Sequence, residues 1–486
     1  MSAISELTPA EVWIHFDKLC EIPRPSHQEQ GVIEYIESLA DQHGLPHHTD
    51  SAGNLIVTKP ATAGMENCHG IILQGHLDMV TQKSSDSSHN FQTDPIRPFV
   101  DGDWVTADGT TLGADNGIGV AFAIAVLCSN TLKHPPIEAL FTINEESGMT
   151  GALGLEATTL KGNWLLNIDT EEEGELYVGC AGGRDVVVAL PLTYINTPKD
   201  LTFYNLEVSE LSGGHSGIDI HKGRANANKI SNAFLERLSS QTDVYIAQFD
   251  GGSLRNAIPR NACTTIAVPS ADATYCQQIL KQFTQKTQSD YQETDPHLTL
   301  SLTPTAPLDK VLSSSSAITI LSCISDCPNG VSSWLEEMPD VVETSNNLAR
   351  IVSQDDYLHI DISVRSAITS ERNKLAQRIA DLFIQQGASI EFSNSYPGWK
   401  PNLDSSLLTL MQQRYQSLYG KIPKTNVIHA GLECGILGAT YPDWEMISFG
   451  PTITGAHSPD ERVKIADIDK IWHYLIDVLS HIPIKK

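Results

Sequence analysis

The sequence predicts an α/β fold in which a mostly parallel sheet lies between helices and is interrupted by an inserted α+β domain. Towards both ends of the chain, short apolar runs alternate with helical patterns, as they do around parallel sheets. In the middle, longer strand-like segments replace this alternation. The 486 residues also exceed the size at which a single core stops growing. We therefore expect one domain formed by residues 1–186 and 399–486, and an inserted domain formed by residues 187–398.

The first part of the chain contains three predicted helices. Thr8-Pro9-Ala10-Glu11 has the form of a capping box with proline at the first helical position, which predicts a helix as far as Leu19. Residues 28–40 carry apolar side chains at helical spacing. Residues 117–128 are apolar nearly all round, which indicates a buried helix. Short apolar runs predict strands at residues 54–57 and 70–75, between the second and third helices, and at residues 137–143 and 164–168, after the third.

The inserted domain is predicted to contain two successive β-α-β units, so it is possibly a duplication. The first pass has strand-like segments around a helix, at residues 184–190, 201–208, 225–238 (the helix), 245–249 and 264–268. The second has a strand, a helix and a strand at residues 357–364, 370–386 and 389–392. After the inserted domain, the alternation of helix and strand resumes. A helix, a strand and a last helix are predicted at residues 405–419, 445–449 and 465–479.

Composition excludes several classes of protein. The net charge is −27, from 32 basic and 59 acidic side chains, so the surface repels nucleic acid and anionic membranes. The nine cysteines form no CxxC pair, which indicates reduced thiols. The N-terminus shows no secretory signal, and the longest apolar stretch, residues 120–128, is about half of a bilayer span. We expect a cytoplasmic protein with no nucleic-acid or membrane partner.

Candidate metal ligands follow the ends of the predicted parallel strands. The carboxyl ends of such strands form a ligand crevice, so side chains that follow them should meet at one edge of the sheet. The residues placed in this way are His76, Asp78, Glu145, Glu146, Asp169 and His457. Asp115, in a glycine-rich loop just before the predicted buried helix, is expected at the same edge. The acidic run at residues 171–173 is expected to be a solvated turn instead.

Two imidazoles with several carboxylates suit zinc, cobalt or manganese without any thiolate. The potential ligands are too many for one catalytic zinc with an open position, but they suit two ions that share a carboxylate. Glu145 and Glu146 are adjacent and cannot both face one ion from an extended backbone, so one can bind metal while the other moves protons. Asp78 lies two residues after His76, on the same side of an extended segment, and can orient its imidazole.

Five segments together resemble the two-zinc exopeptidase family that includes carnosinase, carboxypeptidase G and the bacterial dipeptidases. They occur in the order of the family and span nearly the whole chain. The segments are Gly75-His76-Leu77-Asp78, Gly113-Ala114-Asp115-Asn116-Gly117, Glu145-Glu146-Ser147-Gly148, Asn167-Ile168-Asp169-Thr170 and Gly455-Ala456-His457-Ser458-Pro459.

The resemblance implies a set of metal ligands. Asp115 would bridge two divalent ions, expected to be zinc with cobalt or manganese as alternatives. His76 and Asp169 would complete one ion's site, and Glu146 and His457 the other. The peptide bond that follows Asp115 would be cis.

The resemblance also implies catalytic and substrate-binding residues. Asp78 would orient the metal-bound histidine, and Glu145 would act as general base toward a metal-bridging hydroxide. His215, in a glycine-flanked loop, would polarise the scissile carbonyl. Asn256 would bind substrate, and Arg365 would hold its free carboxylate.

Two further residues and two alternatives remain open at this point. Gly431 would approach the substrate, and Glu433 would face its amino group. The glycines around His215 could instead mark a tight turn, and Arg365 could instead form a structural ion pair.

The implied activity is the hydrolysis of dipeptides with free termini, with Xaa-His dipeptides such as carnosine as the expected substrates. One alternative is a deacylase of N-acyl amino acids on the same scaffold, and another is a binding protein that has lost its chemistry. The insertion of about 210 residues is large enough to supply His215 within one chain, so a homodimer is possible without being required. We expect this insertion to act as a lid that closes over the substrate.

Overall fold

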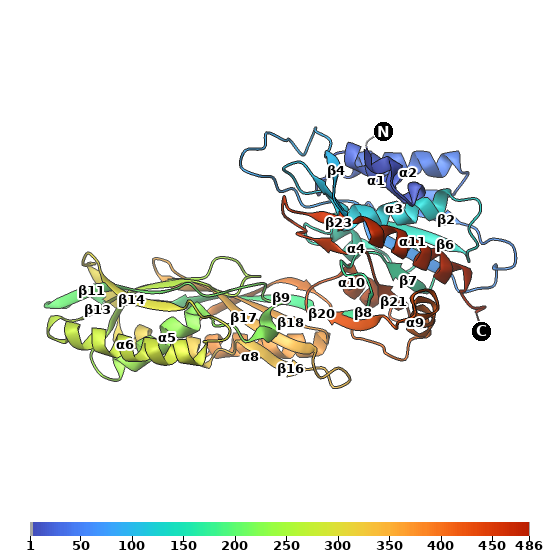
Figure 1. Cartoon of the computed structure of the whole chain (residues 1–486). Coiled ribbons are helices and arrows are strands. Elements are labelled where there is room, and N and C mark those ends of the chain that lie inside the picture. Colours follow the sequence, from blue (N-terminus) through green and yellow to red (C-terminus); the bar gives the residue numbers. More distant parts are fainter. Residues whose placement is uncertain (1–2, 486) are drawn as a thin grey trace. The chain divides into compact units, whose positions relative to one another are not determined.

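The computed structural model describes residues 3–485, which divide into two compact units (Figure 1). Unit 1 consists of Met1–Cys180, Trp399–Val427 and Leu432–Lys486. Unit 2 consists of Ala181–Gly398 and the short segment Ile428–Gly431. Within residues 3–485, no helix combines the length and the apolar character needed to cross a bilayer.

Unit 1 is built on an eight-stranded mixed sheet, which confirms the predicted α/β class. Its four central strands, β6, β3, β7 and β21, pair in parallel. In order across the sheet, the strands are β1 (His47–Thr49), β2 (Leu55–Lys59), β6 (Ile137–Thr142), β3 (Ile71–His76), β7 (Trp164–Asn167), β21 (Glu445–Ser448), β8 (Glu175–Cys180) and β20 (Lys424–Ile428).

The sheet is less parallel than the sequence predicts. Antiparallel pairs join β1 to β2, β2 to β6 and β21 to β8. Residues 50–54 connect β1 to β2 directly, and so short a connection can only produce an antiparallel pair. A second, four-stranded sheet was not predicted; it comprises β22 (Ile453–Thr454), β23 (Arg462–Lys464), β5 (Trp104–Ala107) and β4 (Pro98–Asp101).

Helices pack on both faces of the main sheet. The side of β3 at Gly75 meets α3, whereas the side chain of Gln74 points to α10 on the other face. The helices of unit 1 are η1 (Ala3–Glu6), α1 (Ala10–Glu21), α2 (Gln30–Gln42), α3 (Ala114–Cys128), α4 (Thr150–Gly154), α9 (Ser406–Tyr419), α10 (Glu433–Thr440) and α11 (Ile465–Ser480). The predicted capping box does not form, because Pro9 itself occupies the N-cap of α1 and no side chain caps the helix.

The start of α3 is drawn tightly onto the sheet. The Asp115–Asn116 peptide is cis, and the Asn116 side-chain amide donates a hydrogen bond to the carbonyl of Ile168 at 2.5 Å. A Cβ atom at either Gly75 or Gly119 would collide with the Asn116 side chain. Glycine at these two positions therefore lets α3 approach closely enough to present Asp115 at the sheet edge.

Unit 2 contains a nine-stranded sheet in which every recorded strand pair is antiparallel. In order, its strands are β14 (Thr299–Pro304), β11 (Leu201–Ser209), β13 (Ala262–Pro269), β12 (Tyr245–Gly251), β17 (Val342–Ser353), β18 (Tyr357–Ser366), β9 (Gly182–Pro191) and β19 (Ser389–Tyr396), with β16 (Gly330–Trp334) paired to β17. A two-stranded sheet joins β10 (Tyr194–Asn196) to β15 (Lys310–Leu312).

One apolar core lies between this sheet and its helices, which cover one face (Figure 1). The helices of unit 2 are α5 (Ala227–Ser239), α6 (Ala273–Asp290), α7 (Ser314–Asp326) and α8 (Thr369–Ile384), with short 3-10 turns η2 (Ile220–Lys222) and η3 (Ser270–Asp272). α6 was not predicted, because polar residues interrupt its apolar spacing.

Candidate active site

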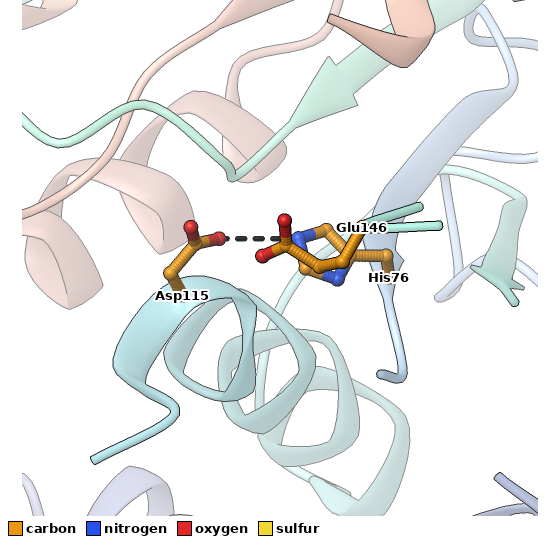
Figure 2. A group of neighbouring side chains, drawn as sticks. All are labelled: His76, Asp115 and Glu146. Carbon is orange, nitrogen blue, oxygen red and sulfur yellow. Dashed lines mark hydrogen bonds and ion pairs between the residues drawn. The ribbon is translucent and has the colours of Figure 1, made fainter. Parts of the chain in front are cut away.

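Asp115 lies between two histidines at the carboxyl edge of the main sheet. His76 Nε2 is 3.1 Å from Asp115 Oδ1 and 3.4 Å from Asp169 Oδ1. His457 Nε2 is 3.0 Å from Asp115 Oδ2 and 3.1 Å from Glu146 Oε1. Figure 2 shows Asp115 at the start of α3 with its carboxylate facing the His76 imidazole and Glu146 alongside. All five predicted metal ligands are thus joined in one contact network.

The elements that present these side chains explain why they meet. His76 is the last residue of β3, and Asp169 follows β7 by two residues. Glu146 lies in the loop after β6, and Asp115 lies in the first turn of α3. His457 follows β22 in a turn and adopts a positive φ of 62°. The ends of the parallel strands β3, β6 and β7, the start of α3 and the turn after β22 together gather residues that are up to about 380 positions apart in the chain.

The donor set fits divalent cations. The ligand atoms of His76, Asp115 and Glu146 all lie within 4.8 Å of one another. Glu146 Oε1 and Asp169 Oδ1 are buried and lie within 3.4 Å of a histidine Nε2, but neither has a hydrogen-bond donor among the described residues. Buried carboxylate oxygens left without donors are costly unless a cation satisfies them. Imidazole and carboxylate donors around a shared aspartate are the ligand types of zinc and related metals.

Asp78 connects the histidine to the loop that carries both glutamates. Its fully buried carboxylate lies 3.4 Å from His76 Nδ1 and accepts main-chain N–H bonds from Glu145 at 3.0 Å and Glu146 at 3.1 Å. It also accepts the Ser26 hydroxyl at 2.7 Å. Burial alone would raise the pKa of Asp78, but these donors and His76 lower it to about 2. Asp78 therefore remains ionised and holds the parts of the site together.

The surroundings of Glu145 favour the protonated form of its carboxyl group. Burial raises its pKa well above the ordinary value, and the neighbouring carboxylates of Asp169 and Glu146 raise it further, against the opposing effect of His76. A divalent cation at the site would act in the opposite direction and keep the group available as a base.

Two buried charged residues, whose part in the site the sequence does not reveal, clamp the loop before Asp115. The Arg24 guanidinium donates to the carbonyls of Leu77 at 3.0 Å and Asp78 at 3.1 Å, and also to that of Gly113. Arg24 therefore ties the segment after β3 to the loop that enters α3. Its only sequence signal is its position between two prolines, which carries no information about distant carbonyls.

Glu461 holds the same loop through the loop's main-chain N–H groups. Its carboxylate accepts the main-chain N–H groups of Leu112 at 2.8 Å, Gly113 at 2.9 Å and Asp115 at 3.2 Å. Since Glu461 ends the turn that contains His457, it also couples that turn to the bridging aspartate. The sequence places Glu461 beside His457 as a loop or supporting residue, without indicating which groups it holds.

Glu433 does not lie where the sequence analysis expects it. Its side chain has no exposed surface, and Oε2 accepts hydrogen bonds from Gln74 Nε2 and Thr142 Oγ1, both at 2.6 Å. Burial raises its pKa to about 7, against the lowering effects of His76 and of the Thr142 hydrogen bond. A carboxylate without exposed surface cannot meet a substrate in this structure, so the predicted contact with an amino group is not supported.

In unit 2, the loop around His215 fixes the tautomer of its imidazole. Nδ1 accepts main-chain N–H bonds from Gly217 at 3.2 Å and Ile218 at 3.1 Å, which leaves the proton of the neutral ring on Nε2. Burial, together with the charge of Arg365, lowers the pKa of His215 to about 4. At neutral pH, His215 is therefore an uncharged hydrogen-bond donor through Nε2.

Asn256 and Arg365 line one cavity of 320 Å³ in unit 2, together with Arg184 and Tyr396. Arg365 donates to the Tyr396 hydroxyl at 3.2 Å, and its Nε has no partner among the described residues. Within residues 3–485, no carboxylate forms an ion pair with Arg365, so the structural ion pair considered from the sequence is absent. This guanidinium keeps the capacity to bind a free carboxylate.

Asn256 and Gly431 lie on segments tied to the rest of unit 2. The main-chain N–H of Ser216 donates to the carbonyl of Asn256 at 2.7 Å, which joins the Asn256 segment to the His215 loop. Gly431 ends the segment Ile428–Gly431, which also carries the buried His429.

Comparisons with known proteins identify relatives along the full chain. Residues 72–481 match the model for "Peptidase family M20/M25/M40". The cytosol non-specific dipeptidase of Escherichia coli is 42% identical over 485 residues, covering 100% of both chains. The crystal structure of aminoacylhistidine dipeptidase from Vibrio alginolyticus superposes with a TM-score of 0.93 at 44% identity, covering 100% of this chain and 99% of the other. A tripeptidase from Staphylococcus aureus shares the fold at a TM-score of 0.58 and 15% identity, covering 98% and 99%.

Proposed function

Because the chain belongs to peptidase family M20/M25/M40 and is a hydrolase of peptide bonds, we propose that it is a metal-dependent dipeptidase. Its substrates would be dipeptides with free amino and carboxyl ends. The observation that carries the proposal is the contact network of His76, Asp115, Glu146, Asp169 and His457 at one sheet edge. These five residues would hold two divalent ions, with zinc the expected metal and cobalt or manganese able to replace it.

The cations, when bound, would lower the pKa of a water molecule and polarise the scissile carbonyl. Glu145 would take a proton from that water and deliver it to the leaving amine, which suits its position next to Glu146 and its readiness to hold a proton. Asp78 would keep the His76 ring and the main chain of Glu145 in a fixed relation. Arg24 would hold the loop of Asp115 through a carbonyl group, and Glu461 would hold it through main-chain N–H groups.

Unit 2 would supply the groups that recognise the substrate. His215, with its proton on Nε2, would donate a hydrogen bond to the oxygen that becomes negative as the carbonyl is attacked. Arg365, which has no acidic partner within residues 3–485, would bind the terminal carboxylate, and Asn256, which lines the same cavity, would complete that subsite. Gly431 would approach the substrate. Closure of unit 2 as a lid, and the homodimer considered from the sequence, stay predictions.

We further propose a preference for Xaa-His dipeptides, carnosine included, and a cytoplasmic location. Support for the preference comes from the relative of Vibrio alginolyticus, whose name specifies aminoacylhistidine substrates, although the Escherichia coli relative is named as non-specific. That second name also refers to the cytosol. The second candidate function is removal of an acyl group from an amino acid, which would not require a charged amino end.

One experiment tests the proposal and separates the two functions. The purified protein is freed of metal with a chelator, reloaded with zinc, cobalt or manganese, and assayed on carnosine, glycyl-histidine, alanyl-alanine and N-acetyl-histidine. The proposal predicts metal-dependent cleavage of the dipeptides and little cleavage of the N-acetyl compound. Preferential cleavage of N-acetyl-histidine would establish the deacylase instead. Dipeptide cleavage that survives complete metal removal would refute the proposed mechanism.

A further inference from the structure

A continuous chain of buried polar side chains crosses the four parallel strands of unit 1. Ser448 on β21 donates to Asn167 on β7, and the Asn167 amide donates to Gln74 Oε1 on β3 at 2.5 Å. The Gln74 amide then donates to Thr142 Oγ1 on β6 at 3.1 Å and to Glu433 Oε2 at 2.6 Å. All five side chains are at most 1% exposed.

The strand register explains why these side chains can connect. Gln74 on β3 is the Cα partner of Asn167 on β7, and Asn167 is the partner of Ser448 on β21. The three residues therefore form one row across the sheet and point to the same face. Glu433, the first residue of α10, reaches that row from outside the sheet.

Every donor in the chain points toward Glu433. The hydroxyl of Thr142 donates to the same oxygen as the Gln74 amide, so two donors converge on Glu433 Oε2. Because Glu433 Oε2 accepts both of these hydrogen bonds, it fixes which side of the Gln74 amide faces α10. That orientation in turn leaves Gln74 Oε1 to receive the Asn167 amide. One acidic residue thus sets the direction of the whole chain.

The hydrogen-bonded row of side chains lies next to the residues proposed to hold metal. Gln74 precedes His76 by two positions, and Asn167 precedes Asp169 by two positions. Thr142 is the last residue of β6, immediately before the loop that carries the two glutamates. Lateral or rotational slippage of any of these strand ends would change the spacing between the ligands that they carry.

We propose that Glu433 is a positioning residue that fixes the geometry of the divalent-cation site through Gln74, Thr142 and Asn167. It does not touch the substrate or the cations. This inference rests on the proposed function only in that the site binds divalent cations. It assigns to Glu433 a role within the sheet that replaces the expected contact with a substrate amino group.

The experiment measures zinc affinity by competition with a chromophoric chelator, in the absence of any substrate. Glu433→Met keeps the length of the side chain but removes the acceptor, and zinc affinity is expected to fall about 10- to 100-fold. Glu433→Gln keeps an acceptor for Gln74 and Thr142, and its affinity is expected to stay within about threefold of the wild type. Rescue by this conservative variant is the result that a loss of packing alone would not produce.

Glu445→Met is the matched control. Glu445 also sits on this sheet and accepts hydrogen bonds from Trp164 and Leu407, but at the amino end of β21, far along the strand from the ligands. This variant is expected to melt at a lower temperature with unchanged zinc affinity. Equal zinc affinity in Glu433→Met and the wild type would overturn the inference, as would an equal loss in Glu433→Met and Glu445→Met.

If Glu433→Met does not fold, Gln74→Met serves as the test instead, because it removes the central residue of the same row of hydrogen bonds. A loss of zinc affinity of tenfold or more supports the inference, and an unchanged affinity overturns it. These outcomes are separate from the test of function. A wild type that binds zinc but cleaves no dipeptide would refute the proposed activity and leave this comparison intact.

Discussion

The main-chain N–H of Glu145 donates to Asp78 Oδ1 at 3.0 Å, while the same carboxylate group lies 3.4 Å from the His76 ring. The proposed base and a proposed metal ligand are thus held by one buried aspartate. Because this group also accepts the N–H of Glu146, it controls three functional residues at once. Its removal should be more harmful than the loss of one hydrogen bond.

Asp78→Asn should lower both metal affinity and activity. The asparagine amide would oppose a main-chain N–H group, leaving a donor unpaired inside the site. We expect a loss of about 10- to 100-fold in zinc affinity and a larger loss in kcat/KM. Zinc competition and steady-state assays on carnosine measure the two effects. Ser26→Ala, which removes one donor to the same carboxylate, is the control and should change both values by less than about tenfold.

Glu145→Gln should separate proton transfer from metal binding. The variant keeps the shape of the side chain but cannot accept a proton, so kcat is expected to fall about 10²- to 10⁴-fold with normal zinc content. Glu146→Gln is the matched neighbour and should lose zinc as well as activity. Zinc analysis of both proteins beside their kinetics is the measurement. Loss of zinc from Glu145→Gln alone would show that the two roles are exchanged.

Arg365→Met should weaken recognition of the substrate's carboxylate. Arg365 forms no ion pair within the described chain, and its removal leaves no acid unpaired. KM for a dipeptide is expected to rise about 10- to 100-fold, which corresponds to about 1.5–3 kcal/mol for a hydrogen bond to a charged group. The same dipeptide with an amidated C-terminus is the comparison substrate, and its hydrolysis should change little. An equal rise in KM for both substrates would contradict the proposal that Arg365 binds the terminal carboxylate.

Buried His429 should make the protein less stable in mild acid. Burial, with the charge of Arg365 as the next cause, lowers the pKa of His429 to about 3. An unfolded chain binds a proton at this histidine below about pH 6.5, whereas the folded chain does so only near pH 3. The contribution is therefore constant above pH 6.5, and stability decreases as the pH falls from there toward 3. At pH 5 the expected loss is about 2 kcal/mol.

Unfolding measured at pH 7 and pH 5 tests this expectation. The decrease in the free energy of unfolding between the two values should be smaller by about 2 kcal/mol in His429→Gln than in the wild type. His473→Gln, which changes an exposed histidine on α11, should leave the decrease unchanged. Identical pH dependence in His429→Gln and the wild type would contradict the account of this buried imidazole.

The location of the proposed metal ligands could be predicted because it depends on a regular rule. Strands at residues 70–75, 137–143 and 164–168 correspond to β3, β6 and β7, and polar residues that follow parallel strands meet at one edge. The resemblance to the two-zinc exopeptidase family, based on five short segments, is confirmed by the family match and by the full-length relatives.

The supporting residues could not be predicted in the same way. Arg24, Gln74 and Glu433 act through buried partners that are 50 or more positions away in the chain. Hydrogen bonds of this kind leave no periodic pattern in the sequence. The acidic run at residues 171–173 was expected to be a solvated turn. However, Glu173 forms an ion pair with Lys470 at 2.7 Å and is not simply solvated.

Errors in the fold have comparable causes. The pairing direction of β8 with β21 depends on how distant segments meet, which strand periodicity does not encode. β17 was missed because its buried residues include Ser345, Asn346 and Asn347, whose polar side chains hide the strand pattern. Tertiary partners outweigh local preference at such positions.

The segment Ile428–Gly431 has a consequence for any attempt to study unit 2 in isolation. It belongs to unit 2, although unit 1 residues flank it on both sides. His429 within it hydrogen-bonds Ser345 at 2.8 Å, and the carbonyls of Ile428 and Ala430 accept the N–H of Ala181. A recombinant fragment cut at residues 181 and 398 would thus lack one of its own interior pieces. To express unit 2 separately, residues 428–431 would have to be added as a peptide or joined to the fragment through a new connection.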